Sequence, residues 1–332
     1  MNKPLVAVIG TGGTISSVVD DSLDVLNYPD ISRKMNSAEA IARIQETERF
    51  AQYVPLPFRA VGSSAILPSD WIELAQLIMR TAQERPEIRG FVILHGTATI
   101  EETGYFLNLV LKTDKPVVLV GAQRPASAVS SDVNMNVLAA VRTAIDEQSI
   151  GKGVLIVLND EIHSARDATK TSTYRLQTFR SHDFGLLGHV DGDRIEFYRS
   201  PVRKHTLESP FDISEISVLP RVDIVYSYAG ADATAVDAFV AAGAKGIISA
   251  GLAPGIPAPL ERKALERAAA SGVLVVQCSR AGSGRVARRQ YLCDQGMLGS
   301  DNLNPQKARI LLALALTKTN DPDKIQAFFE ML

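Results

Sequence analysis

Short apolar runs alternate with helix-like stretches along the first two-thirds of the chain. The runs are rich in β-branched residues and end in glycine or polar residues, as buried strands do; they cover 5–9, 91–94, 116–120 and 153–158. Between them, apolar residues recur every three or four positions, which predicts amphipathic helices over 71–83, 102–111 and 134–145. This alternation predicts a mostly parallel sheet with helices on both faces.

Polar residues at the start of two of these helices indicate how each helix begins. Ser69 is a candidate N-cap of the first helix, because its hydroxyl can accept a hydrogen bond from a free backbone N–H. Thr99 followed by Glu102 fits a capping box at the start of the second helix.

Short polar, proline-bearing pieces interrupt the alternation between residues 194 and 219. It then resumes on a smaller scale, with expected strands over 222–226, 246–249 and 273–277 and expected helices over 233–242, 259–271 and 305–317. The sequence therefore predicts the α/β class, with a large N-terminal domain over 1–197, a linker over 198–219 and a small C-terminal α/β domain over 220–332.

The composition excludes several classes of partner. The 332 residues leave room for two domains, and 46% hydrophobic with 22% charged residues is an ordinary globular composition. A net charge of -2 provides no basic surface for nucleic acid. The apolar stretch 309–316 is far too short to cross a bilayer. We therefore expect a small-molecule partner rather than a nucleic acid or a membrane.

The N-terminus and the cysteines bear on the compartment. The chain runs directly into the apolar segment 5–9, without the charged segment, apolar core and cleavage site of a secretory signal. Taken as complete, the protein is expected to be cytoplasmic; a mature form trimmed of its signal would begin in the same way. Cys278 and Cys293 have no histidine companions, which predicts buried free thiols rather than a zinc site or a disulfide framework.

Four polar or glycine-rich loops follow expected strands, and they are Thr11–Ile15, His95–Thr103, Gly121–Pro125 and Arg166–Thr171. Taken singly, each has an ordinary explanation, as a tight turn, a helix cap, a strand-end loop or a solvated lysine. The first loop has neither the G-x-G-x-x-G spacing of a dinucleotide site nor the Gly-Lys-Ser/Thr of a P-loop. Because the carboxyl ends of parallel strands share one edge of a sheet, the loops together mark a candidate ligand site.

In combination, these segments resemble the type II L-asparaginase and glutaminase-asparaginase family. The likeness runs nearly end to end, and its clearest segments are His95–Thr103, Lys115–Pro125, Arg203–Thr206 and Leu303–Arg309. The resemblance implies a two-domain α/β fold and the hydrolysis of a side-chain amide to a carboxylate and ammonia by threonine hydroxyls, with no metal and no other cofactor. It also implies a homotetramer, a pair of intimate dimers in which neighbouring subunits share each site.

The family's catalytic residues carry over onto four positions. Thr14 corresponds to the nucleophile, and Tyr28 to the tyrosine of the mobile flap that closes over it. Thr97 corresponds to the second catalytic threonine, and Lys170 to the base or proton relay beside it. A threonine hydroxyl is a weak nucleophile that needs activation by a neighbour, so the retained set implies intact hydrolytic machinery.

The resemblance also implies a substrate-binding set. Ser63 would hold the substrate's α-carboxylate, and backbone N–H groups near Thr97 and Ala98 would stabilise an oxyanion. The whole set comprises Gly62, Ser63, Ser64, Gly96, Ala98, Ala122, Pro254 and Arg288.

Four parts of this set depart from the family. Ala98 replaces an aspartate that orients the lysine and receives the substrate's α-ammonium, and Ser64 replaces a glutamine that faces the same ammonium. Pro254 replaces an asparagine that comes from the neighbouring subunit. The region 283–291, which should carry a neighbouring-subunit glutamate, holds three arginines and no acid; they are Arg285, Arg288 and Arg289.

All four departures remove groups that would receive a cation, and Lys170 is expected to have lost its anionic partner. Leaving a buried ammonium without its partner costs about 3–5 kcal/mol, which predicts poor activity on asparagine and glutamine. The expected substrate is a small carboxylate-bearing amide, imide or cyclic amide without a free α-amino group. Two alternatives stay open: an ordinary L-asparaginase or glutaminase, and a non-catalytic relative that binds a small acid.

Overall fold

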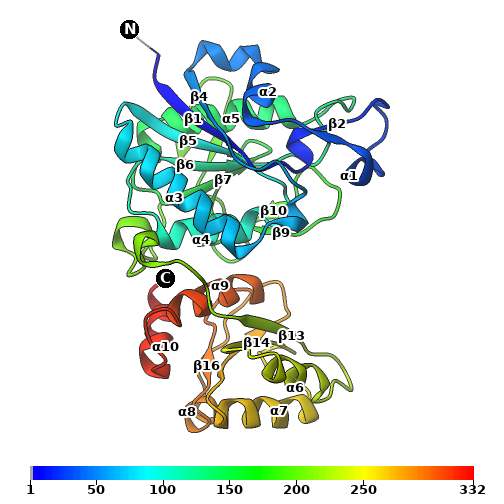
Figure 1. The fold of residues 1–332 in the computed structure, drawn as a ribbon, viewed down its shortest axis with the longest axis vertical. Helices are drawn as coiled ribbons and strands as arrows, with labels where there is room; N and C mark the ends of the chain where they lie inside the picture. Colours follow the sequence, from blue (N-terminus) through cyan, green and yellow to red (C-terminus); the bar gives the residue numbers. More distant parts are fainter. Residues whose placement is uncertain (1–2) are drawn as a thin grey trace. The chain divides into compact units, whose positions relative to one another are not determined.

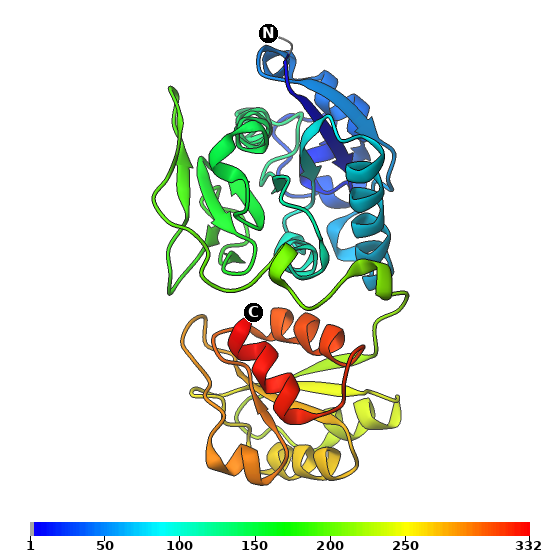
Figure 2. The same cartoon turned by 90° about the vertical axis from the view of Figure 1, so that its left-hand side faces the viewer.

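The computed structural model describes residues 3–332 of the chain. The chain forms two compact units, and the division between them falls between Ser214 and Glu215. This point lies inside the stretch 198–219. Figures 1 and 2 show each unit as a sheet flanked by helices, so the predicted α/β class, with a large N-terminal and a smaller C-terminal part, is confirmed.

The N-terminal unit contains a mixed sheet of eight strands within the described residues, in the order β12-β11-β8-β7-β6-β5-β1-β4. The strands are β1 (Leu5–Gly10), β4 (Gln52–Leu56), β5 (Ile88–Leu94), β6 (Val117–Val120), β7 (Val154–Leu158), β8 (Glu161–Ser164), β11 (Gly188–Val190) and β12 (Ile195–Phe197). The pairs from β4 to β7 are parallel, as predicted, and those from β7 to β12 are antiparallel.

The change of direction has a local cause. Asn159 and Asp160 form the two-residue loop between β7 and β8, and their φ angles are 53° and 61°. Two positive φ angles match the twist of a tight hairpin, and Asn and Asp tolerate this conformation better than most residues. The sequence pattern did not predict this hairpin, so the antiparallel strands extend the sheet beyond the predicted parallel part.

Helices cover both faces of this sheet, as predicted (Figure 1). They are α2 (Ser37–Ala42), α3 (Pro68–Glu84), α4 (Ile100–Val110) and α5 (Val133–Ile145), with the short α1 (Tyr28–Ile31) outside the layers. Alternate residues of the central strands pack with α2 and α5 in one apolar cluster. On the other face α4 contacts β7, and Trp71 of α3 stacks on Phe106 of α4 with ring centroids 5.6 Å apart.

Two helix starts differ from the predictions. The first helix begins at Pro68 rather than after Ser69, because Pro is suited to the first helical position and the Asp70 carboxylate accepts a hydrogen bond from the Leu67 backbone N–H at 2.8 Å. Thr99 is the N-cap of α4, but it makes no side-chain capping bond. Its hydroxyl donates instead to the Ser63 carbonyl at 2.9 Å, so the predicted capping box is wrong.

The C-terminal unit contains a parallel sheet in the order β13-β14-β15-β16. Its elements are β13 (Val222–Tyr226), α6 (Thr234–Ala241), β14 (Gly246–Gly251), α7 (Pro259–Ala270), β15 (Leu274–Ser279), α8 (Gln290–Asp294), β16 (Leu298–Gly299), α9 (Pro305–Ala315) and α10 (Pro322–Met331). Helices α6 and α7 share an apolar cluster with the sheet, whereas α9 contacts it with α10 packed alongside. Cys278 is buried as predicted, but Cys293 is exposed.

Candidate active site

Glycines bring the loop after β1 against two neighbouring segments. Gly12 and Gly13 have φ angles of 97° and 80°, a region that residues with a Cβ rarely adopt. A Cβ on Gly12 would lie 2.2 Å from the Val61 carbonyl oxygen, and one on Gly13 would lie 2.1 Å from the Gly96 Cα. This close approach sets Thr14, which opens the short 3₁₀ turn Thr14–Ser16, beside the loop that follows β5.

Thr14 and Tyr28 form the first pair of predicted catalytic residues. Their hydroxyl oxygens are 2.9 Å apart, and either can donate. Tyr28 is the first residue of α1, and the segment that carries it is closed by the short antiparallel ladder of β2 (Ser17–Val18) with β3 (Arg33–Lys34). The two side chains that the resemblance paired are therefore within hydrogen-bond distance, and their roles stay predictions.

Thr97 and Lys170 form the second pair. The Lys170 Nζ donates to the Thr97 Oγ1 at 2.7 Å. Lys170 lies on β9 (Thr169–Lys170), which pairs with β10 (Phe179–Arg180). Thr97 is buried in the loop after β5, and a Cβ added to Gly121 would lie 2.7 Å from its methyl carbon, so glycine leaves room for Thr97 there.

A third side chain, that of Gln123, contacts both Thr97 and Lys170, and the sequence analysis did not predict it. Its Oε1 accepts from the Thr97 hydroxyl at 3.2 Å and from the Lys170 Nζ at 3.3 Å. The loop Gly121–Pro125 was recognised as a strand-end loop. Nothing in its sequence marked the glutamine as the residue that turns inward.

Lys170 keeps an anionic neighbour, contrary to the expectation. Partial burial lowers the pKa of Lys170, while the carboxylate of Glu101 opposes that shift electrostatically. Glu101 is buried on the first turn of α4, and its Oε1 accepts from the Lys170 backbone N–H at 3.2 Å. A lysine with a lowered pKa is neutral more often near pH 7, which suits a base or proton relay.

His95 supports the same loop from beneath. The Trp71 indole N–H donates to the Thr103 Oγ1 at 3.0 Å, so the Thr103 hydroxyl is free to donate to the His95 Nε2 at 2.9 Å. The other ring nitrogen, Nδ1, then donates to the Gly96 carbonyl at 2.8 Å. Burial lowers the pKa of His95 to about 4, so a neutral imidazole holds the loop in place.

The predicted carboxylate-binding segment lies against this loop. A Cβ on Gly96 would lie 2.5 Å from the Ser63 Cβ, so Gly96 lets the two segments touch. Gly62, Ser64 and Ala98 are exposed beside them. Ala122 is fully buried and its methyl group belongs to the apolar core, which leaves only its backbone to face a ligand.

Pro254 and Arg288 belong to the C-terminal unit. Pro254 lies in the turn after β14, in which the Leu252 N–H donates to the Ile256 carbonyl. The Arg288 guanidinium forms an ion pair with Asp323 at 2.7 Å and donates to the Met297 carbonyl at 3.0 Å. Arg288 is thus engaged inside its own unit, and its role at a shared site stays a prediction.

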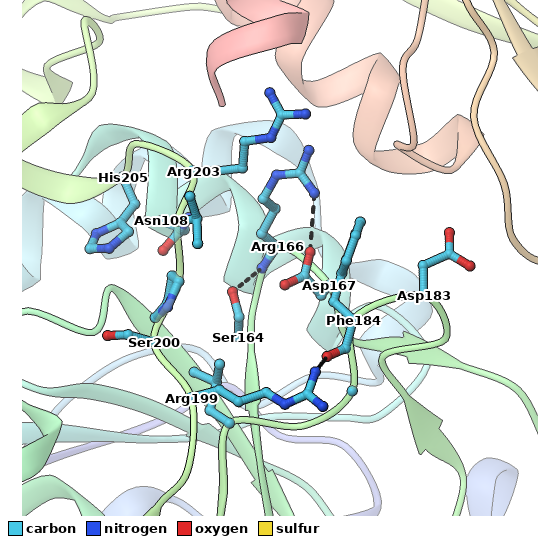
Figure 3. Close-up of a pocket in the computed structure, with 14 residues that line it drawn as sticks. Asn108, Ser164, Arg166, Asp167, Asp183, Phe184, Arg199, Ser200, Arg203 and His205 are labelled. Carbon is cyan, nitrogen blue, oxygen red and sulfur yellow. Dashed lines mark hydrogen bonds and ion pairs between the residues drawn. The ribbon is translucent and has the colours of Figure 1, made fainter.

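A cavity of about 570 Å³ lies elsewhere in the N-terminal unit (Figure 3). Its lining includes Arg166, Asp167 and Arg203, whereas Thr14, Thr97 and Lys170 do not line it. The Arg166 guanidinium pairs with the Asp167 carboxylate at 3.0 Å, which steadies the loop that leads to β9. Among residues 3–332, no group of three or more His, Cys, Asp or Glu side chains is arranged to hold a metal ion. Within the same range no helix is long and apolar enough to cross a membrane.

Family models match almost the whole chain. The asparaginase N-terminal model matches residues 5–203, and the glutaminase/asparaginase C-terminal domain model matches residues 221–329. The chain belongs to the asparaginase family.

Individual asparaginases are similar over nearly their full length. A probable periplasmic L-asparaginase of Haemophilus influenzae is 40% identical over 98% of this chain and 93% of its own length. L-asparaginase 2 of Escherichia coli is 40% identical over 98% of this chain and 92% of its own. The crystal structure of a probable cytoplasmic L-asparaginase from Campylobacter jejuni superposes with a TM-score of 0.96 at 38% identity, covering 99% of this chain and 100% of that one.

Membership of the asparaginase family confirms the predicted resemblance, the fold and the reaction class. The protein is a hydrolase that acts on carbon–nitrogen bonds.

Proposed function

We propose that this asparaginase-family hydrolase cleaves a small carboxylate-bearing amide, imide or cyclic amide that lacks a free α-amino group. The observation that carries the proposal is Ala98, an exposed residue between Thr97 and Thr99 at the position where the family resemblance implies a carboxylate. The nearby carboxylate of Glu101 is buried and accepts from the Lys170 backbone. With alanine at position 98, no carboxylate there can pair with a substrate α-ammonium, and a substrate without that group needs no such partner.

The chemistry follows from the two hydroxyl pairs. Thr14 Oγ1 attacks the amide carbonyl carbon as its proton passes to the Tyr28 hydroxyl 2.9 Å away, which releases its own proton towards the leaving nitrogen. Backbone N–H groups near Thr97 and Ala98 stabilise the oxyanion that develops. With that proton the nitrogen leaves as ammonia, or the ring of a cyclic substrate opens, and neutral Lys170 then takes a proton through Thr97 from the attacking water and returns it to the Thr14 oxygen. Water then cleaves the acyl ester and regenerates the Thr14 hydroxyl.

A second candidate is an ordinary L-asparaginase or glutaminase. The names of relatives at 40% identity favour it. In that case the ammonium would be received by groups other than a side chain at position 98. Tight binding of small acids without turnover of any amide would instead indicate a non-catalytic relative.

A panel of matched substrates separates these functions. Succinamate and glutaramate are asparagine and glutamine without the α-amino group, and 5-oxoproline is a cyclic amide that carries a carboxylate but no free α-amino group. Ammonia release or ring opening is measured for each, with Thr14→Ala and Lys170→Met as controls. The proposal expects turnover of at least one amino-free compound and its loss in both variants. Turnover confined to asparagine and glutamine, or unchanged in Thr14→Ala, would overturn it.

The proposed assembly is a homotetramer whose sites are shared between subunits. Pro254 and the arginines of 283–291 then belong to the surface that a neighbouring subunit presents. The family resemblance supports this arrangement. The proposed location is the cytoplasm, in line with the name of the Campylobacter jejuni relative, although the Haemophilus influenzae relative is named periplasmic.

A further inference from the structure

Gln123 is held at both ends, and its amide points in one direction. Its backbone N–H donates to the Asp132 carboxylate at 2.9 Å, and its side-chain Nε2 donates to the Arg175 carbonyl at 3.1 Å. The second bond fixes the amide orientation, because the nitrogen of an amide donates and its oxygen accepts. Only 8% of the residue is exposed. The Oε1 is therefore the atom that faces the catalytic pair.

This single oxygen is an acceptor for two donors. The Thr97 hydroxyl lies 3.2 Å from Oε1 and the Lys170 Nζ lies 3.3 Å from it, while Nζ and the Thr97 Oγ1 are 2.7 Å apart. Each member of the triangle thus contacts the other two. Lys170 and Thr97 are the groups to which proton transfer is assigned, so Gln123 contacts both partners of that step.

We propose that Gln123 is a positioning residue. Its amide oxygen accepts a hydrogen bond from the member of the Thr97–Lys170 pair whose hydrogen is not being transferred. It thereby orients Lys170, as the family resemblance implies an aspartate at position 98 would. This inference rests on the proposed function, because it assigns a role at the same site.

The proton positions can be followed through the step. When Lys170 is an ammonium, one of its N–H groups donates to Thr97, and the Thr97 hydroxyl donates to Gln123. When Lys170 is neutral, the Thr97 hydroxyl turns to the lysine lone pair, and a lysine N–H donates to Gln123 instead. An amide oxygen is not protonated in water near neutral pH, so Gln123 accepts in both states without taking the proton.

The charge around Lys170 distinguishes an amide from a carboxylate at this position. Glu101 on α4 is the charged group that acts on Lys170. On the facing strand Arg180 pairs with Thr169 and its side chain is exposed, and Arg175 contributes its backbone carbonyl while its side chain is exposed. A second carboxylate next to Lys170 would favour the ammonium, which cannot accept a proton.

Two substitutions should shift the chemistry in opposite directions. Gln123→Glu should move the acid limb of the kcat/KM pH profile up by about one unit or more, because it holds Lys170 charged. Gln123→Met removes the hydrogen-bond acceptor. It should move the acid limb of the same profile to lower pH and lower kcat about tenfold, the effect of one lost hydrogen bond to a charged group. Gln76→Glu, on an exposed position of α3, is the matched control and should leave the limb in place.

A titration that needs no turnover separates this inference from the proposed function. The ¹³Cε resonance of Lys170, assigned by its loss in Lys170→Met, is followed with pH in the wild type and both Gln123 variants. The midpoint of the Lys170 titration should be highest in Gln123→Glu, lower in the wild type and lowest in Gln123→Met. If that order holds but no amide is hydrolysed, the proposed function fails and the positioning role stands. If turnover depends on Lys170 but neither limb nor midpoint moves, the role of Gln123 is overturned.

Discussion

Ala98 and Glu101 lie three residues apart at the start of α4, and the sequence indicated the role of only one of them. Ala98 was read from the sequence as a lost carboxylate, and it is exposed beside Thr97. Glu101 belongs to the same recognised segment but was assigned no role, yet its carboxylate accepts a hydrogen bond from the Lys170 backbone N–H. The family resemblance, rather than the strand pattern alone, assigned roles to Thr14, Thr97 and Lys170. It could not reveal which side chains face them, because that depends on how α4 and β9 pack.

At the residue scale, His95 should make the protein sensitive to acid. Its pKa is about 4 in the folded protein, below the ordinary 6.5, so its contribution to stability is full above pH 6.5 and is lost as the pH falls towards 4. The difference corresponds to about 3 kcal/mol. His95→Gln keeps a donor and an acceptor, and should flatten this part of the profile. Urea unfolding at a series of pH values measures it, with the exposed His182→Gln as control. Parallel profiles for His95→Gln and wild type would contradict the neutral, buried imidazole.

At the element scale, the parallel strands could be predicted more fully than the antiparallel edge. Strands such as β6 and β7 are continuous apolar runs that are buried on both faces, which is a strong signal. Strands β8, β11 and β12 are three or four residues long and partly polar, so no periodicity could mark them. The Asn159–Asp160 turn was the available signal, and it needed the hairpin context to be recognised.

The contact between the loops after β1 and β5 gives an element-scale prediction. Gly96→Ala would place a Cβ 2.5 Å from the Ser63 Cβ and 2.9 Å from the Gly13 Cα, so the loops must separate. We expect a loss of about 1–3 kcal/mol in unfolding free energy and a larger proportional loss of kcat. Gly192→Ala is the control, because nothing lies within 4 Å of its added Cβ. Equal kcat for the two variants would refute the role of this contact.

Glu261, a buried acid at the start of α7, gives a second prediction at the element scale. Both carboxylate oxygens of Glu261 are buried without a hydrogen-bond partner among residues 3–332, although Ser227 and Ser249 lie near. Burial raises the pKa of Glu261 above 4.5, so its carboxyl favours folding at low pH and that contribution is lost as the pH rises through the raised value. Glu261→Gln should therefore raise the melting temperature at pH 7 and have little effect at pH 4. A lower melting temperature at pH 7 would show that the charged carboxylate is stabilised.

At the scale of the whole molecule, the hydrolytic groups that contact one another all belong to the N-terminal unit. Thr14, Tyr28, Thr97 and Lys170 lie before Ser214, whereas Pro254 and Arg288 lie after it. Sequence could predict two α/β parts from the break in alternation. It could not show whether one chain or two complete a site, because that depends on assembly.

The proposed shared site makes activity depend on assembly. The particle mass in solution should be four times the 35.8 kDa of the chain, and specific activity should fall when dilution dissociates it. Light scattering after size exclusion gives the mass, and activity over a dilution series gives the dependence. A monomer with full specific activity would exclude sites shared between subunits.

The central claim is that Ala98 sets the substrate class, and one ratio tests it most directly. This is kcat/KM for succinamate divided by kcat/KM for L-asparagine, two compounds that differ only in the α-amino group. The wild type should favour succinamate, and Ala98→Asp should shift the ratio towards asparagine by about a hundredfold or more, the effect of an ammonium–carboxylate pair that the bound substrate shields from water. A wild type that favours asparagine, with a ratio that Ala98→Asp leaves unchanged, would contradict the account.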